Sequence, residues 1–252
     1  MALLDAQSVS KRFSGITALD DVTLDVGEGE SVGLIGPNGA GKTTFFNCLL
    51  GLLRVDAGSV TFDGRDLTRA PVYRRARAGI GRTFQRMELF ADMTVRDHLL
   101  VAERSRLGTG RFWKDVLNRS APSADERART EATLELLGLA RLADAPIEAL
   151  SLGRGRLVEV GRALMTEPKL LLLDEPSSGL DANETAALAD SLRAVQAERG
   201  TAVLLVEHDV EFVRTYVDRV FVLDFGTLIV SGATSDVLAS DEVRRAYLGE
   251  TV

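Results

Sequence analysis

The sequence has little of what disulfide-bonded, secreted or membrane-spanning proteins contain. Its 252 residues include one cysteine, Cys48, so an internal disulfide is excluded, and the apolar helical pattern around Cys48 predicts a small core residue. No apolar stretch approaches the length of a transmembrane helix, and residues 1–11 lack the apolar core of a signal peptide. We therefore expect a cytoplasmic chain, for which any role at a membrane is peripheral.

Positive charge is outnumbered by negative charge. The chain has 30 Lys and Arg residues against 37 Asp and Glu residues, and its net charge of −7 argues against a nucleic-acid-binding protein. Apolar residues make up 45% of a length that suffices for a sizeable core, either as one large domain or as one domain with an inserted subdomain. The sequence shows no internal repeat or low-complexity tract.

A glycine-rich segment between two apolar patterns predicts a phosphate-binding loop. The run 31–35 predicts a short buried strand, 44–53 predicts a helix, and the spacing between them is that of a P-loop. Glycines let backbone N–H groups approach phosphate, and the helix N-terminus adds unpaired donors. Lys42 can reach the β- and γ-phosphates, and the Thr43 hydroxyl can bind Mg²⁺. The candidate nucleotide-binding residues here are Gly36, Asn38, Gly39, Ala40, Gly41, Lys42, Thr43 and Thr44.

Two carboxylates end a second apolar segment. Residues 170–173 are four consecutive leucines, a pattern typical of a strand that is buried on both faces of a parallel sheet. Asp174 and Glu175 follow at the C-terminal edge, where open α/β sheets bind ligands. Beside a P-loop, we expect Asp174 to hold Mg²⁺ opposite Thr43 and Glu175 to orient and deprotonate the attacking water.

His208, one of two histidines, follows another apolar strand predicted at 201–206. Because the C-terminal ends of parallel strands share one edge of a sheet, we expect this histidine to lie near the bound phosphates.

Capping patterns mark several helices. Asp181 and Glu184 form a capping box, and Gly200 ends the helix predicted over 182–199. Further helices are predicted at 94–103, at 123–137 and from Ser151 to about 166, and strands at 16–26, 59–64, 219–223 and 227–230. The unpatterned segment 105–122 is either a surface insertion or an edge that faces a partner.

Six motifs stand in the order and spacing of an ABC-transporter ATPase subunit, which this sequence resembles over essentially its whole length. They are the P-loop, Gln85, 150–153, 170–175, 178–181 and His208. Within that family, segments 81–85, 89–95, 206–209 and 245–249 resemble the ATPases of branched-chain amino acid importers.

The resemblance implies a role for each matching residue. Phe13 matches the aromatic residue that stacks on adenine, whereas its position alone favours an ordinary loop aromatic. Gln85 matches the glutamine that contacts Mg²⁺ or water and senses the membrane subunit. Ser151 and Gly153 match the signature motif, which caps ATP bound to the opposite protomer.

Asp181 matches the aspartate of the D-loop, and His208 matches the histidine at the γ-phosphate. The helix that Ser151 opens, about 16 residues or roughly 24 Å long, begins far in sequence from the P-loop, so its anion-binding end needs a phosphate from elsewhere. Two residues depart from the usual signature: Leu152 replaces a glycine, and Arg154 replaces a glutamine and is followed by Gly155. Arg154 either attracts phosphate or misplaces the helix end.

The resemblance implies an α/β fold with a P-loop NTPase core, an N-terminal antiparallel β-sheet and an inserted α-helical subdomain. We expect one domain over 1–252, with a nucleotide-binding core at 1–85 and 166–252 and a helical subdomain at 86–165. The implied ligands are ATP and Mg²⁺. The implied partners are a second ATPase subunit in a homo- or heterodimer, integral membrane permease subunits and, indirectly, a substrate-binding protein, with no nucleic acid.

The implied function is ATP hydrolysis that powers import of branched-chain amino acids or related small amides, at the cytoplasmic face of the inner or plasma membrane. Two alternatives stay open. One is the ATPase of a lipid or lipopolysaccharide exporter, which shares much of the C-terminal pattern. The other is an ABC ATPase of translation or DNA repair, although such proteins usually have tandem cassettes or a long coiled-coil insertion, which this chain lacks.

Overall fold

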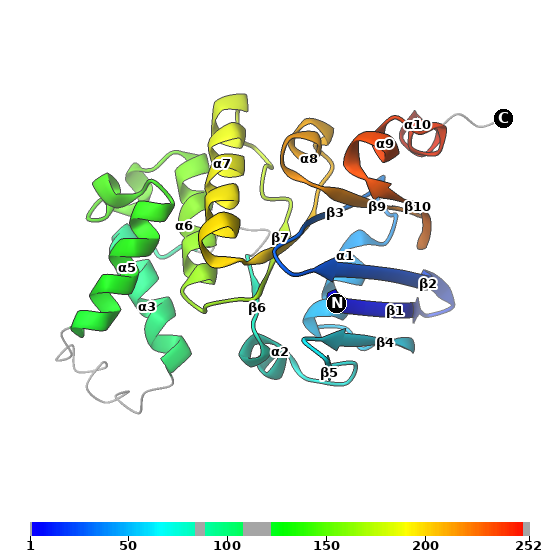
Figure 1. Cartoon of the computed structure of the whole chain (residues 1–252), viewed down its shortest axis with the longest axis horizontal. Coiled ribbons are helices and arrows are strands. Elements are labelled where there is room, and N and C mark those ends of the chain that lie inside the picture. Colours follow the sequence, from blue (N-terminus) through cyan, green and yellow to red (C-terminus); the bar gives the residue numbers. More distant parts are fainter. Residues whose placement is uncertain (1, 84–88, 108–121, 249–252) are drawn as a thin grey trace.

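The computed structural model describes residues 2–83, 89–107 and 122–248, which form two β-sheets with helices on both sides of the larger one (Figure 1). The smaller sheet is antiparallel, in the order β2-β1-β4-β5. Its strands are β1 (Ala2–Phe13), β2 (Ile16–Gly27), β4 (Ala57–Phe62) and β5 (Arg65–Asp66).

The larger sheet has six strands in the order β10-β9-β3-β8-β7-β6. Its strands are β3 (Ser31–Ile35), β6 (Ile80–Arg82), β7 (Leu170–Asp174), β8 (Ala202–Val206), β9 (Arg219–Asp224) and β10 (Thr227–Ala233). All neighbours are parallel except β9 and β10, which form an antiparallel hairpin. The C-terminal ends of β3, β7 and β8 therefore lie along one edge of this sheet.

The leucine run in β7 is buried on both faces of the sheet. Leu170 and Leu172 face one apolar cluster, and Leu171 and Leu173 face the other. All four are inaccessible to solvent, and full burial of one leucine contributes about 1.5–3 kcal/mol to folding. Apolar and polar residues do not alternate in this strand because neither of its faces meets water, as the sequence predicted.

The P-loop helix α1 (Lys42–Leu50) lies between the two sheets. Its buried side chains Phe45, Phe46 and Leu49 belong to the cluster that also contains residues of the antiparallel sheet and one face of the parallel sheet. Cys48 is buried in the same cluster, as predicted. The packing on both sides fixes the direction in which the N-terminus of α1 points.

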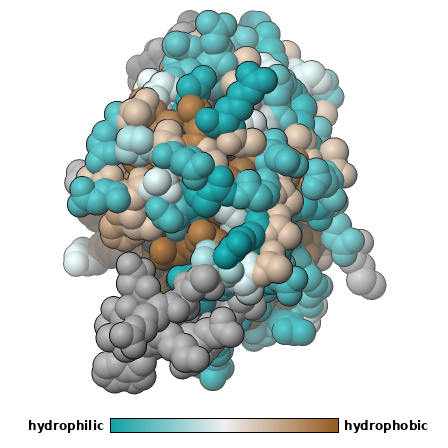
Figure 2. Space-filling model, turned by 90° about the vertical axis from the view of Figure 1, so that its left-hand side faces the viewer, coloured by the Kyte–Doolittle hydropathy of each residue, from teal (hydrophilic) through white to brown (hydrophobic). Residues whose placement is uncertain are grey.

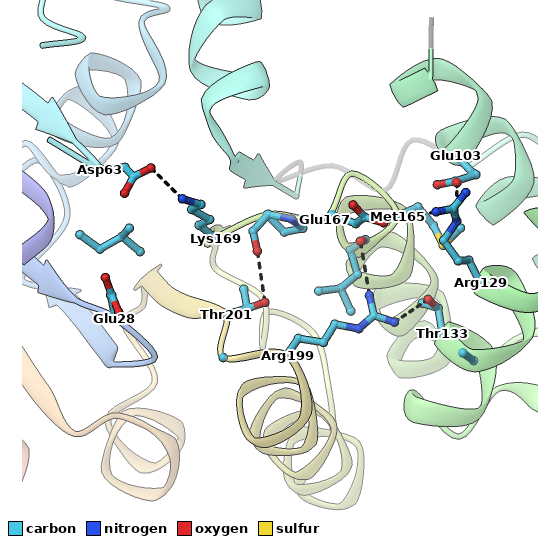
Figure 3. A pocket seen from close by; sticks show the side chains of 15 residues that line it. Glu28, Asp63, Glu103, Arg129, Thr133, Met165, Glu167, Lys169, Arg199 and Thr201 are labelled. Carbon is cyan, nitrogen blue, oxygen red and sulfur yellow. Dashed lines mark hydrogen bonds and ion pairs between the residues drawn. The ribbon is translucent and has the colours of Figure 1, made fainter. Parts of the chain in front are cut away.

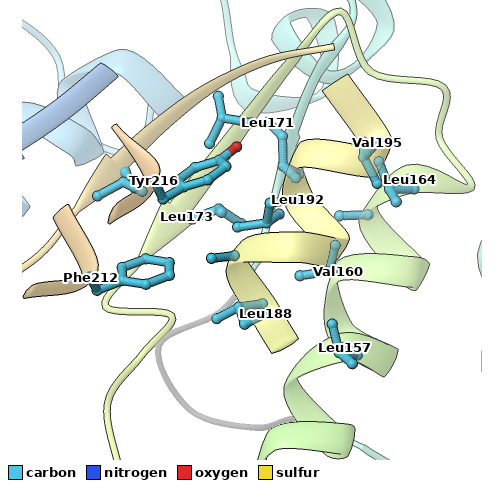
Figure 4. Close-up of a cluster of buried hydrophobic side chains, with 14 of the residues drawn as sticks. Leu157, Val160, Leu164, Leu171, Leu173, Leu188, Leu192, Val195, Phe212 and Tyr216 are labelled. Atoms are coloured by element: carbon cyan, nitrogen blue, oxygen red, sulfur yellow. The ribbon is translucent and has the colours of Figure 1, made fainter. Parts of the chain in front are cut away.

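Helices cover the opposite face of the parallel sheet. They are α3 (Val95–Leu107), α5 (Ala124–Leu136), α6 (Leu152–Leu164), α7 (Ala182–Arg199), α8 (Val210–Tyr216), α9 (Thr234–Leu238) and α10 (Asp241–Leu248). Figure 4 shows side chains of α6, α7 and α8 meeting Leu171 and Leu173 in one cluster. The short helix α2 (Val72–Ala78) precedes β6, and two 3₁₀ turns, Ala140–Leu142 and Ile147–Ala149, join α5 to α6.

Several predicted boundaries are corrected by the structure. Helix α1 begins at Lys42 and ends at Leu50, not at 44 and 53, because Gly51 takes a left-handed conformation that terminates it. Helix α6 has 13 residues rather than about 16. Helix α8 and strand β6 were not predicted, since seven and three residues are too few to establish a period. The bounds of α7 match the prediction.

The predicted fold class is confirmed, with an antiparallel sheet, a mainly parallel sheet and helices between 89 and 165. The division into core and helical subdomain stays a prediction, because one apolar cluster runs from α3 and α5 through α6 to the sheet. Figure 2 shows the face that carries α3 and α5 as mainly hydrophilic. Within the described ranges, no helix is long and apolar enough to span a membrane.

Candidate functional site

The P-loop follows β3 and is shaped by two glycines at close contacts. Gly36 has φ +148°, and a Cβ there would overlap the carbonyl oxygen of Leu223 in β9. Gly41 has φ +102°, and a Cβ there would lie 2.6 Å from the carbonyl oxygen of Ala18 in β2. The loop is thus held between both sheets, while Asn38 and Gly39 at its tip are exposed.

The N-terminus of α1 differs from an ordinary capped helix end. Its N-cap is Gly41, no side chain of the described residues caps it, and its first turn, which includes Thr43 and Thr44, has no acidic residue. The backbone N–H groups there have no intrahelical partner and lie at the positive end of the helix dipole. This end of α1 is suited to a phosphate.

Lys42 is buried within the loop that it follows. Its ammonium donates to the carbonyl oxygens of Gly36 at 2.7 Å and Pro37 at 2.9 Å. Burial lowers the pKa of Lys42, and the carboxylates of Glu175 and Asp174 act in the opposite direction. The structure therefore brings the lysine near both carboxylates that the sequence singled out.

Asp174 is the last residue of β7 and pairs with Val206 of β8. Burial raises the pKa of Asp174, the neighbouring Glu175 carboxylate raises it further, and Arg82, and to a lesser degree Lys42, lower it. Negative charge is thus concentrated at this edge of the sheet, and a divalent cation would relieve it.

Glu175 follows, and its backbone has φ +47°, a conformation that residues other than glycine rarely adopt. Such a conformation costs about 1–3 kcal/mol and is common at active sites. Its N–H donates to the Val206 carbonyl at 2.9 Å, and its carboxylate lies 3.9 Å from the Nδ1 atom of His208. The structure therefore brings Glu175 and His208 together at the ends of neighbouring strands.

Glu207 is a buried carboxylate beside these residues that the sequence did not single out. Its side chain is inaccessible to solvent. One oxygen accepts from the N–H and hydroxyl of Ser177 at 2.9 and 2.7 Å, and the other from the N–H groups of His208 and Asp209 at 3.1 and 3.3 Å. This carboxylate ties the segment after Glu175 to the segment of His208. The available signal was an acidic residue that directly extends a buried strand.

A second helix N-terminus of interest belongs to α6. Ser151 is its N-cap, and the Ser151 hydroxyl accepts from the N–H of Arg154 at 3.4 Å. The Gly153 N–H donates to the carboxylate of Glu184 at 3.2 Å. Hydrogen bonds from the Ser151 hydroxyl and the Gly153 N–H lower the pKa of Glu184. This helix end thus already holds a carboxylate of its own chain. Asp181 caps the neighbouring helix α7.

Phe13 ends β1 in the hairpin that leads to β2, with 42% of its surface exposed and the Lys11 ammonium 5.4 Å from the ring centroid. The hairpin is joined to the loop through Ala18, whose carbonyl approaches Gly41. Gln85 lies outside the described residues.

A pocket of about 610 Å³ lies elsewhere, at the N-terminal ends of β7 and β8 (Figure 3). Lys169 pairs there with Asp63 at 2.7 Å, and Arg129 pairs with Glu103 at 2.8 Å. Because ligands of open α/β sheets bind at the C-terminal ends of the strands, this pocket is not the nucleotide site.

Comparisons with known proteins agree with the geometry. The family model described as "ABC transporter" matches residues 19–178. The high-affinity branched-chain amino acid transport ATP-binding protein LivG of Salmonella typhimurium is 39% identical over 252 residues, with 98% of each chain covered. BraF of Pseudomonas aeruginosa, described in the same terms, is 37% identical with the same coverage.

A solved structure, described as the ADP conformation of an ATP-binding cassette of an ABC transporter, matches with a TM-score of 0.86 and 33% identity, covering 99% of this chain and all of the other. The family that the motifs indicated is therefore confirmed. The chain belongs to the ABC transporter family, as one of its ATPase subunits.

Proposed function

We propose that this chain binds ATP at the P-loop and hydrolyses it with Glu175 as the base, to drive import of branched-chain amino acids. The observation that carries the proposal is the meeting of three groups at one sheet edge. These are the buried Lys42, the charged pair Asp174 and Glu175, and His208 at 3.9 Å from the Glu175 carboxylate.

The triphosphate would bind along the P-loop from Gly36 to Thr44. The N–H groups at the start of α1 would donate to phosphate oxygens, since the first turn holds no competing acid. Lys42 would exchange its bonds to the Gly36 and Pro37 carbonyls for the β- and γ-phosphates. Phe13 would stack on the adenine ring.

Mg²⁺ fits the donors at this edge. Thr43 and Asp174 would hold it, together with Gln85 as the family resemblance implies. Among the described residues, no group of three or more His, Cys, Asp and Glu side chains forms a metal cage. A site with the single carboxylate of Asp174 suits Mg²⁺, which usually takes one or two carboxylates and completes its shell with other oxygens, including those of phosphate and water. When bound, the cation neutralises charge that develops on the phosphates.

The chemistry of the residues then follows. A water attacks the γ-phosphorus, Glu175 accepts its proton, and the bond to the ADP oxygen breaks. His208 donates a hydrogen bond to the γ-phosphate. The Glu207 carboxylate keeps Glu175 and His208 in position by binding the segment that follows Glu175 and the backbone of His208. Ser151 and Gly153 of a second subunit would cap the same phosphate, and the Asp181 segment would lie at that interface.

The names of two relatives support the proposed cargo. LivG and BraF are named for branched-chain amino acid transport, which favours import over the exporter alternative. Membrane permeases and a substrate-binding protein would contact the cargo, and this subunit would act at the cytoplasmic face of the membrane.

Phosphate release and ATP binding of the purified chain test the proposal together. Glu175→Gln should bind Mg-ATP as the wild type does and lose at least about a hundredfold in turnover, because the base is removed while the phosphate contacts remain. Glu198→Gln, an exposed residue of α7, serves as the control and should hydrolyse normally. Unchanged turnover of Glu175→Gln would refute the role of Glu175.

A transport assay tests the cargo. Vesicles that contain this subunit with its cognate permeases and binding protein should take up labelled leucine in an ATP-dependent manner. Uptake of other solutes but not of branched-chain amino acids would leave the ATPase standing and refute the cargo.

A further inference from the structure

The first glycine of the P-loop is held by a residue from the far end of the chain. Gly36 directly follows β3, and its N–H donates to the hydroxyl oxygen of Tyr247 at 2.9 Å. The two residues are 211 positions apart, and Tyr247 belongs to the C-terminal helix α10. The P-loop therefore has a contact that none of its sequence motifs contains.

Both peptide groups that flank Gly36 are hydrogen-bonded to side chains. The Tyr247 hydroxyl holds the plane that precedes the glycine, and the Lys42 ammonium holds the plane that follows it, through the Gly36 carbonyl at 2.7 Å. The glycine also lies against the Leu223 carbonyl, where no Cβ fits. The orientation of this residue thus sets the starting position of the Lys42 ammonium.

Tyr247 is itself fixed by its surroundings. Its ring packs against the apolar cluster on the helical face of the parallel sheet. Burial raises the pKa of the Tyr247 hydroxyl, the Gly36 N–H lowers it, and the buried Glu207 carboxylate raises it. The hydroxyl therefore stays neutral at physiological pH, with its oxygen directed to the loop.

We infer that Tyr247 is a positioning residue for nucleotide binding, which keeps the Gly36 peptide in place when Lys42 moves to the phosphates. This inference rests on the proposed function, in which Lys42 leaves the Gly36 carbonyl for the β- and γ-phosphates. Once the ammonium has left, the Tyr247 hydrogen bond is the remaining side-chain hydrogen bond to Gly36 among the described residues. The C-terminal helix thereby becomes part of the nucleotide site without contacting the nucleotide.

The test compares two Tyr→Phe variants that each lose one hydroxyl. Tyr247→Phe removes the bond to Gly36. Tyr216→Phe, the matched control on α8, removes a 2.7 Å bond to the side chain of Gln196. Both variants keep the aromatic ring, so both should fold and melt within a few degrees of the wild type. Mg-ATP and ADP dissociation constants, KM and kcat are measured for each.

Tyr247→Phe should raise the dissociation constants of both ATP and ADP about threefold to tenfold, the range of one hydrogen bond. KM for ATP should rise in step, and kcat at saturation should stay within about twofold of wild type, because Glu175 and His208 are untouched. Tyr216→Phe should change none of these values.

Two outcomes overturn the inference: nucleotide affinity equal in both variants, or a loss of kcat at unchanged KM. Failure of the proposed function has a different signature, since wild-type protein would then not hydrolyse ATP at all.

Discussion

A phosphate is expected at the N-terminus of α1 and at the N-terminus of α6, yet the two helix ends are capped differently. The α1 end is capped by a glycine and has no acid in its first turn. The α6 end is capped by the Ser151 hydroxyl, and Gly153 donates to the carboxylate of Glu184. Among the described residues, the α1 end has no side-chain cap, whereas the α6 end has a carboxylate of its own chain in place.

The difference indicates how the two ends are used. The α1 end can take a phosphate within a single chain, and Lys42 and Asp174 lie beside it. Helices α6 and α1 pack against opposite faces of the parallel sheet, and under the proposed function a phosphate at α6 would come from another subunit. That phosphate would have to displace Glu184. Binding is thus expected first at α1, and closure of a dimer at α6 second.

The largest expected effect is at the α1 end. Lys42→Ala should weaken ATP binding at least about a hundredfold and abolish turnover, because it removes the buried cation that reaches the phosphates. Lys169→Ala, at the opposite edge of the sheet in an exposed pair with Asp63, is the control and should bind ATP normally. Equal binding by both variants, measured by titration calorimetry, would contradict the assignment.

Glu207→Gln should lower kcat about tenfold or more with little change in ATP affinity. An amide cannot accept all four hydrogen bonds that the carboxylate accepts, so the segments of Glu175 and His208 lose their common anchor. A loss of about 1–3 kcal/mol in unfolding free energy is also expected. Glu103→Gln alters a carboxylate equally buried but far from this edge, and should destabilise without lowering kcat. If both variants lose kcat alike, the effect is one of stability alone.

Phe13→Ala should weaken ATP binding by about 1–3 kcal/mol if the ring stacks on the base. Stacking accepts any base, so GTP and ATP should be discriminated poorly in both proteins. Unchanged ATP affinity, measured by fluorescence titration, would make Phe13 an ordinary half-exposed aromatic.

The smallest effect is expected at the α6 end. Glu184→Gln keeps an acceptor for the cap of α7 but removes the negative charge beside Gly153. In a Glu175→Gln background, the ATP-bound dimer should therefore form a few-fold more tightly. Sedimentation at several protein concentrations gives the dimer constant. A weaker dimer would mean that the carboxylate positions this helix end rather than competing for it.

Local patterns predicted the elements that carry the motifs. The capping box at Asp181 and the glycine at 200 gave the bounds of α7, and the four leucines gave a strand buried on both faces. Helix α8 was missed because its two turns establish no period. The order of the motifs along the chain was enough to identify the family.

The contacts of Glu207, Tyr247 and Glu184 could not be predicted in this way. Each residue contacts a segment between 30 and 211 positions away, and a local sequence pattern does not specify a partner at such a separation. Gln85 lies outside the described residues, so its role stays a prediction. Local physics therefore located the loops of the site, and the fold supplied the side chains that hold them.

The dependence of hydrolysis on a second chain is the most direct test of this account. Light scattering should find Glu175→Gln monomeric without nucleotide and dimeric with Mg-ATP. Wild-type activity should rise faster than linearly with protein concentration, and Ser151→Arg should suppress it while ATP binding persists. A monomer that hydrolyses ATP at a concentration-independent specific rate, unaffected by Ser151→Arg, would contradict the account.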